Sequence, residues 1–299
     1  MEILGNFLAL VAALLFAIST IYMRLGLIQG NIIAGLFLII LVHTLLGVCM
    51  VFIASLSGAI PTINYLGIIY FSLAGVVSSI LARFFRMICM EHIGASRSTS
   101  FKVISPVFTI TIGSMFLHEY MSILALCGTV TVLLGLIVVI YSTQGSNDEI
   151  LYTKGNIKRG VAFGLLTALA FSLGNILRKV GLEFIPSSEI GFATGAFTAL
   201  VCIITYVGYV EKKEFIDKIV HSYNINFIYC GVFSGLGLYV FFLALRLTTV
   251  SKANVLVITE VLITILLSSL VIRKYEAINS RLVLGSILVF AGLILVINY

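Results

Sequence analysis

Long apolar runs separated by short polar steps fill almost the whole chain. An α-helix needs about 20 mostly apolar residues to cross a lipid bilayer, and windows of that kind recur from one end to the other. They lie at residues 4–23, 32–54, 65–90, 96–117, 122–142, 160–178, 188–209, 225–245, 251–272 and 280–298. The pattern therefore predicts an all-α membrane protein with ten transmembrane helices.

The same pattern occurs twice along the chain. Short segments match at an offset of 155 residues or, after a two-residue insertion, 157. The matches are Ala-Leu-Leu-Phe at 13–16 with Ala-Leu-Ala-Phe at 168–171, Ser96-Arg97 with Ser251-Lys252, and Glu119, Gly128 and Gly135 with Glu276, Gly285 and Gly292. Because five helices per copy is an odd number, the second copy must enter the membrane from the opposite side. We therefore predict two inverted five-helix repeats, at 1–142 and 160–299, joined by a polar linker at 143–159.

Composition supports a protein surrounded by lipid. Apolar residues make up 61% of the chain, charged residues 10%, and the mean hydropathy is +1.19. Soluble domains carry roughly 45–50% apolar and about 25% charged residues. The net charge of +6 comes from basic residues scattered singly, mostly near the ends of the apolar windows. Such placement is typical of anchoring beside lipid headgroups and argues against nucleic-acid binding.

Sequence motifs that carry enzyme chemistry are missing. The chain contains no HExxH, no GxSxG, no P-loop and no Gly-rich dinucleotide turn. Its five cysteines lie within apolar windows without CxxC spacing, which indicates small buried side chains rather than metal ligands or disulfides. We therefore expect no catalysis, no cofactor and no metal site.

Several motifs resemble those of a known family. Ala-Ser-Arg-Ser at 95–98 precedes Ser-Pro-Val-Phe at 105–108, and Phe-Leu-His-Glu at 116–119 precedes Gly128 and Gly135. With these motifs the chain resembles the ten-helix EamA members of the drug/metabolite transporter superfamily. The second copy departs from the pattern, because Val261 stands where the proline would be. The resemblance implies a multi-pass transporter of the bacterial plasma membrane and says little about its cargo.

Charged residues inside the apolar windows are the candidates for a binding site. Burying one in a bilayer costs at least about 2.5–3.5 kcal/mol, so each needs a reason to be there. Glu260 lies roughly 13 Å into the ninth window, near mid-membrane, where a carboxylate must be paired, protonated or facing a wet cavity. It is predicted to bind a cationic group, pair with a basic residue or exchange a proton. The alternative is a neutral glutamic acid held by neighbours such as Thr259 and Thr264.

Three basic residues accompany Glu260. Arg83 lies roughly 10 Å and Lys102 roughly 9 Å from the ends of their windows, whereas Arg86, at roughly 6 Å, is expected to extend to the headgroups. Extension to the headgroups also explains Lys102. If Arg83 and Lys102 instead face the interior with Glu260, the three can hold the carboxylate and the amine of a zwitterion. That arrangement favours amino acids or related metabolites.

Other residues are predicted to complete the site or to shape the helices. The polar candidates for the lining are Ser19, Thr20, Asn175, Tyr239 and Asn254, although each alone is also explained by a hydrogen bond between helices. Pro106 is expected to bend the fourth helix, as a hinge or as a fixed kink. Glu119 and Glu276 are expected to be structural turn residues.

The predicted function is a secondary-active transporter, an exporter of small polar metabolites such as amino acids, working by alternating access around a midplane cavity. Its expected partners are the substrate, membrane lipid, a proton or other coupling ion and at most a second copy of the chain. Two alternatives within transport stay open, an exporter of hydrophobic drugs and a flippase for lipid-linked precursors. The alternative of another class is a membrane scaffold or accessory subunit that transports nothing.

Overall fold

The computed structural model describes residues 2–58, 61–93, 98, 101–143, 154–210, 224–271 and 280–298, and the regular structure in them is helical. Ser96, Arg97, residues 144–153 of the predicted linker, and Glu276 lie outside this part of the chain. The first half contains α1 (Glu2–Gln29), α2 (Ile32–Leu56), α3 (Tyr65–Ala74), the π-helical η1 (Gly75–Ala82), α4 (Arg83–Ile93), α6 (Ser105–Phe116) and α7 (Ile123–Thr143). The second contains α8 (Lys154–Phe184), α9 (Ser188–Val210), α11 (Ile225–Leu247), α12 (Val250–Val257), α13 (Glu260–Val271) and α14 (Ser280–Asn298).

Six of the described helical segments are long and apolar enough to cross a membrane. They are Glu2–Leu27, Ile32–Leu56, Tyr65–His92, Lys158–Phe184, Ser188–Tyr209 and Ile225–Leu247. Shorter apolar helices lie at Ser105–Phe116, Ile123–Val138 and Val283–Ile297. The all-helical membrane architecture is thus observed, while the count of ten spanning helices stays a prediction.

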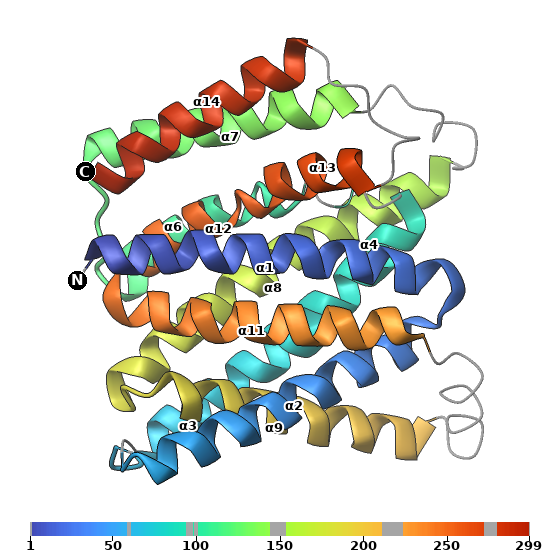
Figure 1. Cartoon of the computed structure of the whole chain (residues 1–299), viewed down its shortest axis with the longest axis vertical. Helices are drawn as coiled ribbons and strands as arrows, with labels where there is room; N and C mark the ends of the chain where they lie inside the picture. The colour runs from blue at the N-terminus through green and yellow to red at the C-terminus, as the bar shows by residue number, and fades with distance from the viewer. Residues whose placement is uncertain are drawn as a thin grey trace.

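Equivalent helices of the two halves run in opposite directions. In Figure 1 the chain enters α1 at the left and leaves it at the right, whereas α8 runs from right to left. The same reversal relates α2 to α9 and α7 to α14 (Figure 1). Helices α1 and α11 pack together, as do α7 and α14. These directions fit an inverted arrangement of two related halves.

Matched glycines let α7 and α14 approach each other closely. A Cβ atom added at Gly128 would lie 2.8 Å from the carbonyl oxygen of Gly292, and one added at Gly292 would lie 2.6 Å from that of Gly128. A Cβ atom added at Gly135 would likewise lie 2.8 Å from the carbonyl oxygen of Gly285. Small residues at helix crossings allow such backbone contact in membranes. The glycines that mark the repeat in the sequence therefore serve helix packing.

The fourth and ninth windows each contain a break instead of a continuous helix. The first break lies at Val103 and Ile104 and the second at Ile258 and Thr259, positions related by the offset of 155. The single helices predicted over 96–117 and 251–272 are therefore wrong, since the first is interrupted before α6 and the second is divided into α12 and α13. Pro106 lies in the first turn of α6, where a missing N–H leaves no intrahelical bond unmade. It begins a new helix rather than bending a continuous one.

Large apolar side chains cover the outside of the helical assembly, while its mostly apolar interior also buries several charged and polar groups. On α2, the outward-facing side chains of Leu45, Val48 and Phe52 are exposed. Arg83 and Glu260, in contrast, are buried. An apolar outer surface of this kind suits a protein covered by lipid.

Candidate functional site

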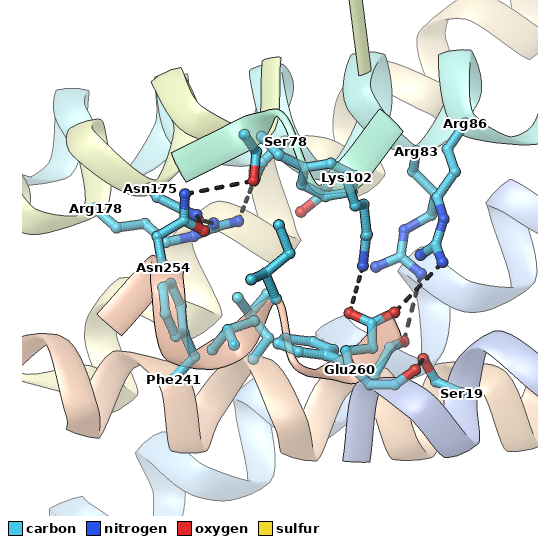
Figure 2. Close-up of a pocket in the computed structure, with 18 of the residues that line it drawn as sticks. Ser19, Ser78, Arg83, Arg86, Lys102, Asn175, Arg178, Phe241, Asn254 and Glu260 are labelled. Atoms are coloured by element: carbon cyan, nitrogen blue, oxygen red, sulfur yellow. Dashed lines mark hydrogen bonds and ion pairs between the residues drawn. The ribbon is translucent and has the colours of Figure 1, made fainter. Parts of the chain in front are cut away.

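A cavity of about 80 Å³, measured as room for the centres of water molecules, lies between the two halves. A single water needs roughly 10–15 Å³ on this measure, so the cavity has room for several waters or a small solute. It is bounded by α1, η1, α4, the break before α6, α8, α11 and the break between α12 and α13 (Figure 2). Its polar and charged lining residues are Ser19, Ser78, Ser79, Arg83, Arg86, Lys102, Ser105, Asn175, Arg178, Ser234, Asn254 and Glu260.

Glu260 is the anionic centre of this cavity. It begins α13, where the positive end of the helix dipole favours a carboxylate. Its Oε2 accepts a hydrogen bond from Lys102 Nζ at 2.5 Å, and its Oε1 lies 3.4 Å from Arg86 Nη2. Thr20 donates to Oε1 at 2.7 Å and accepts from Arg86 at 2.9 Å. Of the possibilities left open by the sequence, the structure shows pairing with basic residues.

Lys102 is held by both halves. Besides its ion pair with Glu260, its ammonium lies 5.9 Å from the ring centroid of Phe16 and 5.4 Å from that of Phe171. These two phenylalanines occupy equivalent positions in the halves, at the offset of 155. Ring faces attract cations, which strengthens the placement of Lys102 at the centre of the cavity. Lys102 therefore points inward and does not extend to the headgroups.

The side chains of Arg83 and Arg86 come from α4 and share its inner face, as their spacing of three residues allows. Arg86 is 5% exposed, so the expectation that it extends to the headgroups is wrong. Arg83 donates to Ser234 Oγ at 3.4 Å, and Ser234 also lies 2.8 Å from His43 Nε2. The buried Nε atoms of both arginines have no partner within the described structure.

A second polar group lies on the opposite side of the cavity (Figure 2). Arg178 donates to Asn175 Oδ1 at 2.7 Å and to Ser78 Oγ, and its guanidinium lies over the ring of Phe242. Asn175 donates to Asn254 Oδ1 at 3.3 Å, and Asn254 donates to Thr109 at 2.5 Å. This chain of hydrogen bonds links α8, α12 and α6, and therefore links the two halves.

The structure brings together most of the predicted site residues. Those that line the cavity are Glu260, Arg83, Lys102, Asn175, Asn254 and Ser19. Thr20 touches the site through Glu260. Tyr239 does not line the cavity, because its hydroxyl donates to Glu189 Oε1 at 2.7 Å. A binding role for the other residues stays a prediction.

Sequence reasoning missed Arg86 and Arg178 as site residues. Arg178 was predicted to end the sixth helix, but α8 continues to Phe184 and buries its guanidinium. The apolar residues Val180, Leu182 and Phe184, which continue the run beyond the charged pair, were the available signal. For Arg86 the signal was its position on the same helix face as Arg83.

Glu119 has the structural role expected of it. Its carboxylate accepts backbone N–H groups of Val250 and Ser251, at 3.2 and 3.4 Å, and so caps the start of α12. In the described part of the chain, no group of three histidine, cysteine, aspartate or glutamate side chains lies together in a way that could hold a metal ion.

Comparisons with known proteins agree with this architecture. A model of the EamA-like transporter family matches residues 3–141 and 158–298. Twenty-nine chains of solved structures match. One of them, a crystal structure, is 12% identical and superposes with a TM-score of 0.68 over 98% of this chain and 96% of that chain, which shows a shared fold. No curated protein matches. The chain is an integral, multi-pass membrane protein, and it belongs to the EamA-like transporter family of the drug/metabolite transporter superfamily.

Proposed function

We propose that this protein is a secondary-active transporter that exports a small polar metabolite, such as an amino acid, by alternating access around the central cavity. The observation that carries the proposal is the cavity itself, which has a charged and hydrogen-bonding lining contributed by both repeats. Buried charges inside membrane proteins mark pathways for substrates and ions, because their burial is costly. A proton or another ion supplies the gradient that drives transport.

The helix breaks give alternating access a structural basis. In transporters built from inverted repeats, discontinuous helices place helix ends at a site near the membrane midplane, and the repeats rock around it. Here both breaks adjoin the cavity, since Ser105 and Ile258 line it. Contacts that cross between the repeats, such as Lys102 with Glu260 and Asn254 with Thr109, must rearrange when the repeats rock.

The observed lining favours polar cargo over the alternatives. A hydrophobic drug or a lipid chain would leave the guanidinium groups of Arg83 and Arg178 without compensation in an apolar surrounding. A scaffold subunit would gain nothing from a cavity large enough for several waters, with buried cations around it. The proposal therefore places the polar metabolite first.

Transport by the purified protein in proteoliposomes tests the proposal. Counterflow of pooled radiolabelled amino acids and organic acids, with and without an imposed pH gradient, is expected to be saturable and absent from empty liposomes. Translocation of a hydrophobic dye or a labelled lipid instead would replace the proposal with one of the two other transport functions. Transport of none of these cargoes would favour the scaffold.

Two polar positions provide a matched pair of variants. Asn254→Ala removes the residue that joins Asn175 to Thr109 within the cavity lining, and we expect transport to fall roughly tenfold or more, because unsatisfied buried partners cost about 1–3 kcal/mol. Tyr239→Phe likewise removes one hydrogen-bonding group, the hydroxyl that donates to Glu189, but this group lies outside the cavity, so transport is expected to be unchanged. Equal loss in both variants would show that transport does not depend on this cavity.

A further inference from the structure

The charges around the cavity do not balance. Four cationic side chains line it, Arg83, Arg86, Lys102 and Arg178, whereas Glu260 is the single carboxylate among the described lining residues. Three of these cations are at most 8% exposed. A buried charge without a counter-charge is strongly unfavourable, so an excess of this size in a membrane needs compensation. The described lining of the cavity therefore carries more positive than negative charge.

Within the described part of the chain, a direct contact with a carboxylate is missing at two of the four cations. Glu260 contacts Lys102 and Arg86, and these three side chains form one cluster. Arg83 and Arg178 donate only to neutral oxygens, of Ser234 in one case and of Asn175 and Ser78 in the other. Within the described structure neither contacts a carboxylate. The Nε of Arg83, in a residue that is 8% exposed, adds a donor that no group in the described part of the chain satisfies.

The two guanidinium groups that contact no carboxylate in the described structure lie on opposite sides of the cavity and come from different repeats. Arg83 belongs to α4 and Arg178 to α8, and Figure 2 shows the one beside Glu260 and the other beside Asn175 and Asn254. Guanidinium groups present a planar fork of donors that matches carboxylate and phosphate oxygens. Two such forks in one small cavity suit a ligand with an anionic group at each end.

We infer that the cargo is a small organic dianion, with one anionic oxygen group at Arg83 and the other at Arg178. The inference rests on the proposed transport function and narrows its substrate class. Glu260 already accepts from Lys102, Arg86 and Thr20, so it is not free to receive the amine of a zwitterion. An amino group on the ligand therefore adds no contact and brings a positive charge into a cationic cavity. Dicarboxylates and phosphorylated carboxylates share the required chemistry.

Binding to the purified wild-type protein tests the charge without any need for transport. Thermal unfolding is followed by the loss of the helical circular-dichroism signal, because the chain has no tryptophan and a thiol-reactive dye would already label the exposed Cys49 and Cys127. The probes, at constant ionic strength, are succinate, aspartate, butyrate, succinamide and 3-phosphoglycerate. Succinate or 3-phosphoglycerate is expected to raise the unfolding temperature most, followed by aspartate, with butyrate and succinamide weakest. The stronger of the first two identifies carboxylate or phosphate as the second anionic group.

Matched variants assign the effect to the two arginines. Arg83→Gln and Arg178→Gln are each expected to weaken binding of the best dianion about ten- to a hundredfold, as for loss of a charge-assisted hydrogen bond. Arg178→Lys keeps the positive charge but loses the planar pair of N–H donors, so an intermediate loss of binding affinity is expected. Lys252→Gln removes one positive charge outside the cavity, where Lys252 pairs with Glu2, and is expected to leave binding unchanged.

Several results would overturn the inference. Among them are equal or stronger stabilisation by succinamide or butyrate, no stabilisation by either dianion, and equal losses in Lys252→Gln and Arg178→Gln. The outcome is separable from that of the proposed function. Transport of a neutral metabolite would refute the dianionic cargo and support the transport function. Binding of a dianion without any transport would support the dianionic ligand and refute the transport function.

Discussion

The fourth and ninth helical segments occupy equivalent places in the two repeats and are interrupted at equivalent residues, but different side chains surround the two breaks. Ile104 N donates to Phe101 O at 3.1 Å, and its counterpart Thr259 N donates to Leu256 O at 3.2 Å. The first break is followed by Pro106 and the second by Val261. Because both copies break, with and without a proline, a proline is not required for the break. The break belongs to the packing of the repeat.

The side chains around the breaks differ in charge as well. The first repeat carries Lys102 directly before its break, where the second carries Val257. The second carries Glu260 directly after its break, where the first carries Ser105. Lys102 and Glu260 meet across the two repeats at 2.5 Å. The two copies have thus diverged into complementary halves of one ion pair while keeping the same backbone.

The largest effect is expected when the acidic member of this pair is neutralised. Glu260→Gln leaves Lys102 and Arg86 buried without their counter-charge, and removing one partner of a buried pair costs about 3–5 kcal/mol. We expect a large fall in the unfolding temperature and loss of transport. Binding of a dianion should restore part of the lost stability, because it supplies negative charge. Full transport with an unchanged unfolding temperature would remove Glu260 from the mechanism.

A double substitution separates the pair from the rest of the cavity. In Lys102→Gln with Glu260→Gln both charges disappear together, and buried polar partners removed jointly cost less than one removed alone. The coupling free energy between the two substitutions is expected to be about 1–3 kcal/mol, since the side chains are in contact. Unfolding temperatures of the two single variants and the double variant measure it. Additive losses would mean that the contact contributes nothing to stability.

Sequence reasoning predicted the features that depend on pattern and depth. The offset of 155 identified equivalent residues, and the depth of Glu260 in an apolar window required that its carboxylate be paired, protonated or facing a wet cavity. It could not supply the second break, because no proline or glycine marks Ile258 and Thr259. It also misplaced Arg178, since a charged pair within an apolar run resembles a helix end. Only tertiary packing distinguishes a cation that faces a cavity from one that faces headgroups.

The smaller effects come from exchanging the residues that follow the breaks. Val261→Pro makes the second copy resemble the first, and it removes the donor of the hydrogen bond from Val261 N to Ile258 O at 3.0 Å. The expected cost is about 0.5–1.5 kcal/mol, because the first turn of a helix otherwise accepts proline. A much larger loss of stability would mean that the backbone conformation at the second break, unlike that at the first, does not tolerate proline.

The smallest effect is expected from Pro106→Val, which makes the first copy resemble the second. Valine at position 106 restores a backbone N–H, and at the equivalent position in the second copy the N–H of Val261 donates to Ile258 O. Replacing proline also gives the unfolded chain more conformational freedom, which favours unfolding by about 0.4–1 kcal/mol. The two changes oppose each other, so the unfolding free energy should change by less than about 1 kcal/mol. Transport should persist, because the repeat rather than the proline breaks the helix. Loss of transport with unchanged stability would instead show that the rigid ring of Pro106 is needed as a hinge, and that the two copies divide the work of movement unequally.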